Sequence, residues 1–242
     1  MIDIIIPIWN EGAMTARCLE TIRQHTKDYR LILIDNGSQQ KEWEIVAKEA
    51  THHKNVRIIQ NDENLGFVKA TNQGIATSTS EYIVLMNNDT EAVDGWLEKL
   101  LLLFNVNDKV GVVAPMCSIA ESWQNIDRLK EAWGEELPGK GYRNVSDMVA
   151  FFCTVISREV IRKCGYLSED FGIGLGDDDW YCYLVHKAKF EILISKEVVI
   201  PHHHRTSFKK LFEKEELRNI QDKNISKFKS KVAEDTGGFQ II

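Results

Sequence analysis

The first half of the chain alternates short apolar runs with segments of helical periodicity, and this alternation restricts it to few folds. The apolar runs cover residues 2–8, 31–34, 56–59, 82–86 and 110–114. The helix-prone segments between them cover residues 14–22, 41–53, 67–76 and 96–104. Nearly continuous, β-branched apolar runs are typical of strands buried on both faces. Strands alternating with helices predict βαβ units, and therefore an α/β fold with a central, mostly parallel sheet flanked by helices.

Polar residues stand at or just after the carboxyl ends of four of these strands, at Asn10, Asp35, Asn64 and Asp89. In open α/β sheets, ligands bind outside the carboxyl ends of the strands. The convergence therefore predicts a ligand site at this edge. A plain turn or helix-cap role is an equally open interpretation for Asp35, and a cap also suits Asp89.

The cluster Asn87-Asn-Asp is similar to the Asp-x-Asp arrangement that holds a divalent cation on a diphosphate. Oxygen ligands suit Mg²⁺ or Mn²⁺, and Mg²⁺ typically combines one or two carboxylates with phosphate oxygens. An amide replaces the first carboxylate here, so Asp89 is the candidate ligand in this cluster.

The second half of the chain is less regular. Residues 116–147 lack a clear period and predict a surface loop with a short helix. Strands are expected at residues 149–156, 190–194 and 198–200, and helices at 157–164 and 177–187. From residue 207 onward the chain is polar and helix-prone.

Three adjacent carboxylates, Asp177-Asp-Asp, open the second of these helices after a glycine-rich loop. One aspartate would suffice to compensate the helix dipole. Three repel one another and can raise the pKa of one member, which favours a general base or a metal site. The loop Gly172-x-Gly-x-Gly is not a dinucleotide fingerprint, because it lies far from the first strand and precedes acids.

The triplet His202-His-His follows a predicted short strand. It is either an exposed polar turn or part of a metal shell, since a neutral imidazole can complete one. Strand alternation would point His203 away from His202 and His204. Lys69 could reach a phosphate or could be solvated.

Composition narrows the function classes. The formal net charge is -6, which argues against binding a nucleic acid polymer. The first residues lack a basic segment of the signal-peptide kind, so a cytoplasmic protein with reduced cysteines is expected. Residues 205–231 carry nine Lys or Arg against four acids. A solvated helix is the favoured interpretation of this tail, and peripheral contact with anionic lipid or a lipid-linked acceptor at the inner face of a membrane is the alternative.

Taken together, these motifs resemble the GT-A fold glycosyltransferases of family 2, over roughly residues 2–207. Four segments of the first half carry the resemblance: Pro7-Ile-Trp-Asn-Glu, Leu33-Ile-Asp-Asn-Gly-Ser, Asn64-Leu-Gly-Phe-Val-Lys-Ala-Thr-Asn-Gln-Gly and Leu85-Met-Asn-Asn-Asp-Thr. The resemblance implies a nucleotide-sugar site that includes Pro7, Ile8, Trp9, Asn10, Glu11, Asp35, Asn36, Gly66, Lys69, Asn72, Asn87 and Asn88.

The second half continues the resemblance. The segments Cys164-Gly-Tyr-Leu-Ser-Glu-Asp-Phe and Gly176-Asp-Asp-Asp-Trp-Tyr-Cys resemble the acceptor-side segment that ends in an acidic pair. Asp178 matches the aspartate that acts as catalytic base, and Asp177 replaces the usual glutamate. His202 resembles the histidine that completes the metal shell, with His204 as the other possible register. Lys189, Leu184 and Asn36 depart from the family pattern, which leaves the sugar and the acceptor open.

The resemblance implies an inverting, metal-assisted glycosyltransferase with Mn²⁺ or Mg²⁺, bound by Asp89 and His202 or His204. The donor would be a UDP-, dTDP- or GDP-sugar, and the acceptor a hydroxyl of a glycan, polysaccharide or glycolipid precursor. Residues 1–207 would form one catalytic domain, with a nucleotide-sugar half at 1–115 and an acceptor half at 116–207, followed by a helical tail at 208–242. A nucleotidyltransferase acting on sugar phosphates and a non-catalytic sugar-binding module are the alternatives.

Overall fold

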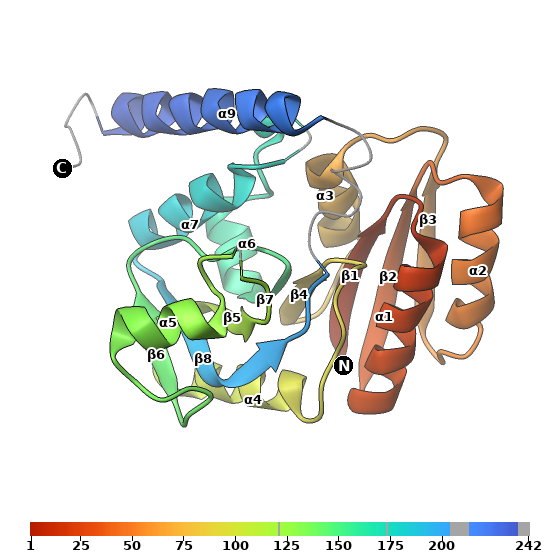
Figure 1. The fold of residues 1–242 in the computed structure, drawn as a ribbon, viewed down its shortest axis with the longest axis horizontal. Helices are drawn as coiled ribbons and strands as arrows, with labels where there is room; N and C mark the ends of the chain where they lie inside the picture. The colour runs from red at the N-terminus through yellow and green to blue at the C-terminus, as the bar shows by residue number, and fades with distance from the viewer. Residues whose placement is uncertain (121, 173, 204–212, 237–242) are drawn as a thin grey trace.

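The computed structural model describes residues 1–120, 122–172, 174–203 and 213–236, which form one eight-stranded sheet with helices on both faces (Figure 1). The strands are β1 Ile2–Ile8, β2 Tyr29–Asn36, β3 Val56–Asn61, β4 Tyr82–Met86, β5 Val110–Cys117, β6 Tyr142–Val145, β7 Cys153–Ser157 and β8 Glu191–Ile200. The α-helices are α1 Gly12–His25, α2 Gln40–Ala50, α3 Phe67–Thr77, α4 Trp96–Leu102, α5 Ile126–Trp133, α6 Arg158–Cys164, α7 Asp177–Lys187 and α9 Lys214–Asp235. Short 3-10 turns lie at Leu103–Asn105 and Glu169–Phe171.

The strand order is β3-β2-β1-β4-β7-β5-β8-β6. Strand β1 pairs in parallel with β2 and β4, β2 with β3, and β5 with β8. Strand β7 runs antiparallel between β4 and β5, and β6 runs antiparallel to β8 at the edge. The carboxyl ends of the six remaining strands therefore meet at one edge of the sheet, as the mostly parallel prediction requires.

Side chains of the apolar strands enter two separate cores, one on each face of the sheet. In β1, Ile4 and Ile6 pack with α1, α2 and α4, whereas Ile5 packs with α3 on the opposite face. This explains why the run is apolar throughout instead of alternating. Helix α3 lies very close to β1, because a Cβ on Gly74 would come within 2.3 Å of the Ile5 side chain.

Three elements differ from the sequence prediction. Edge strand β6 was not predicted, because its residues are mostly exposed and carry no apolar pattern. The two short strands expected at residues 190–200 form one strand, β8, whose pairing with β5 shifts register between Ala114 and Met116. In residues 149–156, regular strand begins only at Cys153. Polar residues and bulges hide such strands from pattern reasoning.

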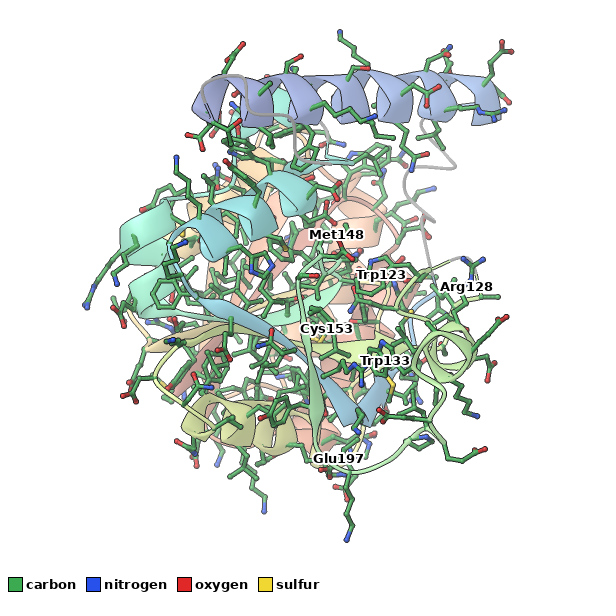
Figure 2. All side chains as sticks on the ribbon, turned by 90° about the vertical axis from the view of Figure 1, so that its left-hand side faces the viewer. Trp123, Arg128, Trp133, Met148, Cys153 and Glu197 are labelled. Carbon is green, nitrogen blue, oxygen red and sulfur yellow. The ribbon has the colours of Figure 1, made fainter. Side chains whose placement is uncertain are left out.

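The irregular region that was expected to hold a short helix contains α5. Trp123 precedes this helix and Trp133 is its last residue, and both are partly buried against the second core. Trp123 Nε1 lies 2.9 Å from Met148 Sδ, and Figure 2 shows Trp123, Met148 and Trp133 together on the side of the molecule that carries α5 and α7. The region around α5 is therefore packed against the core of the protein and does not extend into solvent as a loop. None of the described helices is long and apolar enough to cross a bilayer.

Candidate active site

The turn after β1 is tied to the turn after β2. The backbone N–H of Asn10 donates to Ser38 Oγ at 2.8 Å, and Asn10 Oδ1 accepts from the backbone N–H of Gln39 at 2.8 Å. Asn10 and Glu11 both have a φ of 56°, a left-handed conformation that costs energy for residues other than glycine. Hydrogen bonds to the neighbouring turn hold this shape. Trp9 beside it is half-buried, and Ile8 is a core residue.

Asp35 ends β2 with only 5% of its surface exposed. Its Oδ1 accepts from the backbone N–H of Ser38 at 3.0 Å, and its Oδ2 accepts from Gln60 Nε2 at 3.3 Å. The turn-forming interpretation of Asp35 is therefore realised. The same two bonds fix the direction of the carboxylate at the sheet edge, where a ligand group could also reach it.

Asn36 is fully engaged by the protein. Its Nδ2 donates to Asn64 Oδ1 at 2.8 Å and to the carbonyl of Gly66 at 3.2 Å. Its Oδ1 accepts from Asn61 Nδ2 and from the backbone of Leu65, both at 3.0 Å. Asn36 therefore shapes the turn that starts α3 at Gly66, and a nucleotide contact by its amide stays a prediction. Lys69 is exposed on α3.

Asn72, predicted to lie beside the nucleotide, joins the two halves of the chain. Its Nδ2 donates to the carbonyl of Leu167 at 2.9 Å, and its Oδ1 accepts from the backbone N–H of Leu167 at 3.0 Å. The pair is buried, so both amide groups need these partners. Helix α3 of the first half thereby positions the segment that leads to α7.

Asp89 and His202 are brought together where β4 and β8 end. Thr90 forms an isolated antiparallel bridge with His202, and the backbone N–H of His203 donates to the Asp89 carbonyl at 2.8 Å. Asp89 Oδ1 then lies 3.1 Å from His202 Nε2, with 8% of each side chain exposed. The His202 ring stacks on Phe152 at 5.0 Å between centroids. Backbone pairing and stacking thus orient both side chains.

This pair has the chemistry of a divalent-cation site. Asp89 Oδ1 is buried and accepts no hydrogen bond from the residues that the structure describes. A carboxylate oxygen facing an imidazole nitrogen leaves the other positions of a cation for phosphate oxygens. Across the described ranges, no third His, Cys, Asp or Glu completes a cluster. His203 turns to Glu91 instead, at 2.9 Å, and His204 lies outside the described residues.

The neighbouring asparagines support this corner. Asn88 Nδ2 donates to Thr15 Oγ1 of α1 at 2.9 Å, and the backbone N–H of Asn87 donates to the carbonyl of Phe152 at 2.8 Å. Asn88 is 9% exposed, so its amide acts within the protein. These bonds hold the β4 turn against α1 and against the segment that enters β7.

Three aspartates form the first turn of α7. Asp177 is 3% exposed, while Asp178 and Asp179 are partly exposed. Burial, with the Asp179 charge adding to it, raises the pKa of Asp177 to about 6. Burial and the charges of Asp177 and Asp179 raise the pKa of Asp178 well above its usual value. Asp178 is therefore a strong base when it is ionised, and it is the more accessible member of the pair.

Two hollows on the described part of the surface lie away from Asp89 and from the first turn of α7. One of about 930 Å³ opens at the amino ends of β4 and β5, and its lining includes Arg158 and Arg162. That is the edge opposite Asp35 and Asp89. A smaller one of about 410 Å³ lies at the end of β3, lined by Gln60 and Asn61, which bond Asp35 and Asn36. The smaller hollow is the one that adjoins the predicted nucleoside end.

Comparisons with known proteins agree with this architecture. A family model described as glycosyl transferase family 2 matches residues 3–165. The chain belongs to glycosyl transferase family 2. A curated relative, glycosyltransferase AglE of Haloferax volcanii, is 31% identical over 101 residues, which cover 40% of this chain and 33% of AglE. The match of this family 2 chain therefore spans about a third of the length of AglE.

Solved structures support the same fold. The mannosyltransferase PcManGT from Pyrobaculum calidifontis, in complex with GDP-Man and Mn²⁺, superposes with a TM-score of 0.72 at 16% identity over 96% of this chain and 64% of its own. GalNAc-T7 with UDP, GalNAc and Mn²⁺ superposes with a TM-score of 0.69 at 14% identity, over 84% of this chain and 43% of its own. The GT-A fold prediction for this family 2 chain is confirmed.

Several residues that shape this family 2 site were not singled out by sequence reasoning. Ser38 and Gln60 orient Asp35, and Phe152 stacks on His202. Ser38 lies in a recognised turn motif, which was the available signal. Nothing local marks Gln60 or Phe152, because their partners come from distant strands.

Proposed function

We propose that this family 2 chain is an inverting glycosyltransferase that moves a sugar from a nucleotide-diphospho-sugar to an acceptor hydroxyl. The observation that carries the proposal is the buried Asp89–His202 pair at the same sheet edge as Asp35. The bound GDP-Man in PcManGT, the UDP in GalNAc-T7 and the Mn²⁺ in both support it. UDP-, dTDP- and GDP-sugars are all candidate donors.

The nucleoside would lie at the ends of β1 and β2. Asp35, oriented by Ser38 and Gln60, can accept a hydrogen bond from a ribose hydroxyl or a base. Trp9 offers a half-buried aromatic side chain beside the turn at Asn10, against which a base could pack. This assigns the first turns of the fold to donor recognition.

Asp89 and His202 would hold the divalent cation, with Asn87 and Asn88 shaping the turn around it. When bound, Mn²⁺ or Mg²⁺ supplies positive charge that stabilises the diphosphate leaving group. The protein would contribute two side chains that are already oriented before the cation binds. The Thr90–His202 bridge orients His202, and the β4 turn orients Asp89.

Asp178 would be the general base. The acceptor oxygen attacks the anomeric carbon from the side opposite the diphosphate, and its proton passes to the Asp178 carboxylate. The new C–O bond forms as the bond to the diphosphate oxygen breaks, and the nucleoside diphosphate leaves with that electron pair. Attack from the opposite face inverts the anomeric configuration. Burial, together with the charges of Asp177 and Asp179, would make the Asp178 carboxylate more basic by raising its pKa.

A two-step experiment tests the proposal. Nucleotide sugars are first screened for thermal stabilisation of the chain with and without Mn²⁺, and the stabilising donor is then incubated with metal. A transferase releases nucleoside diphosphate slowly even without acceptor. Release of pyrophosphate from a sugar phosphate and a nucleoside triphosphate would instead identify a nucleotidyltransferase, and binding without turnover would identify a binding module.

The domain assignment and the tail stay proposals. Residues 1–207 would be the catalytic domain and 208–242 a helical tail, of which the structure describes α9. Peripheral contact of the tail with the inner face of a membrane would show as salt-sensitive binding to anionic liposomes that is lost on deleting residues 208–242. In the structure, Lys227 and Lys231 of α9 contact Asp170 of the same chain, so these two charges are already engaged.

A further inference from the structure

Helix α9 lies across α7 and the turn that precedes it, although it is the last described element of the chain (Figure 1). Near its carboxyl end, Asp235 accepts from Tyr183 Oη at 2.6 Å and pairs with Lys187 of α7. Lys231 pairs with Asp170 at 2.5 Å and lies over the Trp180 ring at 4.8 Å. The helix is therefore fastened to the acceptor side of the molecule.

Asn224 stands at the middle of this contact. It is 4% exposed, and its Nδ2 donates to the carbonyl of Gly174 at 2.8 Å and to the carbonyl of Phe171 at 3.2 Å. Both amide hydrogens are thus used on backbone carbonyls just ahead of α7. A buried amide in this arrangement is costly to remove, because its bonds to both carbonyls are lost and, among the described residues, only the Phe171 carbonyl keeps a second donor, the backbone N–H of Gly174 at 3.3 Å.

The turn that Asn224 holds has an unusual backbone. Gly174, Leu175 and Gly176 have φ values of 123°, 68° and 130°. Positive φ at Leu175 is unfavourable for a bulky residue, and such a conformation persists only where the surroundings impose it. The φ of Gly176 also excludes other side chains, and a Cβ there would lie 3.1 Å from the Phe171 ring and 3.4 Å from Asn224 Cβ.

The turn ends directly at the acidic residues. Gly176 is the last residue before α7, and the backbone N–H of Trp180 in the first turn of this helix donates to the Gly176 carbonyl at 3.1 Å. Asp177 and the adjacent Asp178 therefore depend on the shape of residues 174–176 for their placement at the start of α7. Asn224 is the side chain of α9 that bonds this turn.

We propose that Asn224 is a positioning residue, which through its bonds to Phe171 and Gly174 holds the turn at residues 174–176 in the conformation that places Asp177 and Asp178 for the acceptor. The expected effect on sugar transfer rests on the proposed function. The expected effect on the conformation of the turn does not. Asp35 and Asp89, at the donor end, follow other strands, and the two bonds of Asn224 go to Phe171 and Gly174 and not to them. The effect is therefore confined to the acceptor step.

Three variants of the full chain test this. Asn224→Ala removes the amide, and Asn224→Asp keeps its shape but loses both donated hydrogens. Asp235→Asn is the matched control, because it weakens the attachment of α9 to Tyr183 and Lys187 and leaves the Asn224 bonds in place. Hydrogen–deuterium exchange is measured on peptides that contain residues 174–176, and donor binding, donor hydrolysis and transfer to acceptor are measured separately.

Both Asn224 variants are expected to speed exchange at residues 174–176 by about tenfold, because local opening requires only the loss of these bonds. The value of kcat/KM for the acceptor should fall by about tenfold or more, as expected when a reacting group is misplaced. Nucleotide affinity should not change, and Asp235→Asn should have less effect on both measurements.

If hydrogen–deuterium exchange at residues 174–176 is unchanged in Asn224→Ala, the proposal that Asn224 holds this turn is wrong. Faster exchange with unchanged acceptor kinetics would overturn the positioning role, as would an equal kinetic loss in Asp235→Asn. If Asn224→Ala unfolds the chain, Asn224→Asp decides by the same measurements. A wild-type chain that transfers no sugar would contradict the proposed function, while the exchange result would still decide whether Asn224 holds the turn.

Discussion

His202 Nε2 lies 3.1 Å from Asp89 Oδ1, although the two residues come from opposite halves of the chain. Their backbones meet because Thr90 bridges to His202 and Glu91 donates to the carbonyl of Pro201 at 3.0 Å. The ends of strands β4 and β8 thus bring one side chain each to the same corner. This contact is the basis of the first prediction.

Asp89→Ala should weaken metal-dependent binding of nucleoside diphosphate by at least about tenfold, since a charge-assisted ligand is lost. His202→Ala should have a similar but smaller effect. Calorimetric titration with and without Mn²⁺ measures both. His203→Ala is the matched control, because His203 contacts Glu91 on the surface and should leave binding unchanged. If neither Asp89→Ala nor a chelator changes the affinity for nucleoside diphosphate, the assignment of Asp89 to a metal site is wrong.

Asp178→Asn should lower the transfer rate by about 10² to 10⁴-fold, the range expected when a general base is removed. Asparagine preserves the size of the side chain and cannot take up the acceptor proton. Nucleotide binding should remain close to that of the wild type, as judged by titration with Mn²⁺. Asp127, in the first turn of α5 with a side chain that is 80% exposed, provides a control, and Asp127→Asn should retain most activity. Near-normal turnover of Asp178→Asn would show that another residue is the base.

The stability of the protein should respond to pH through Asp177. Its pKa is raised to about 6 by burial, whereas an unfolded aspartate titrates near about 3.9. Between these values the folded state retains a proton that the unfolded state releases, so the free energy of unfolding falls as pH rises through this window. Asp177→Asn should therefore stabilise the protein at pH 8, by on the order of 2 kcal/mol, and have little effect at pH 4.

Thermal unfolding at the two pH values measures this effect. Asp127→Asn is a suitable control, because Asp127 also occupies the first turn of a helix but has a side chain that is 80% exposed. It should change the melting temperature equally at both pH values. If Asp177→Asn also changes the melting temperature equally at both pH values, the Asp177 carboxyl is not held protonated by burial, and the prediction is wrong.

Asp3 should contribute strongly to stability at the opposite edge of the sheet. It is fully buried, accepts two bonds from Arg30 at 2.8 Å and one from Ser78 at 2.7 Å. Burial raises its pKa, but the bonds from Arg30 and Ser78 outweigh this and leave the pKa well below its usual value. Its contribution is therefore present above about pH 4 and is lost as the solution becomes more acidic.

Asp3→Ala should lower the free energy of unfolding by about 3 kcal/mol at pH 7, because it leaves Arg30 and the backbone of Thr79 without their acceptor. Urea denaturation measures the loss. Exposed Arg17, which pairs with Glu20 and Glu91, supplies the comparison, and Arg17→Ala should destabilise the protein much less than Asp3→Ala. An equal effect of the two substitutions would contradict the role of the Asp3 network.

The elements of the fold could largely be predicted from local sequence, because periodicity and turn residues act over a few neighbours. The run at residues 82–86 coincides with β4, and the acids at Asp177 do begin α7. Strand β6 could not be predicted, because its residues face solvent and carry no apolar pattern. The same holds for the site. Its polar residues could be predicted because they follow strands, but the residues that they contact could not.

Local sequence patterns were enough to predict that an α/β sheet would form and that Asp35, Asp89 and the Asp177 group would stand where strands end or a helix begins. The folded structure was needed to show that Asn36 and Asn72 give their amides to the protein, and that the side chains of His202 and Asp89 meet. Those outcomes depend on strand register and on hydrogen bonds between distant segments. Local patterns carry no information about such pairings, because the free energy that selects them arises only when the elements pack together.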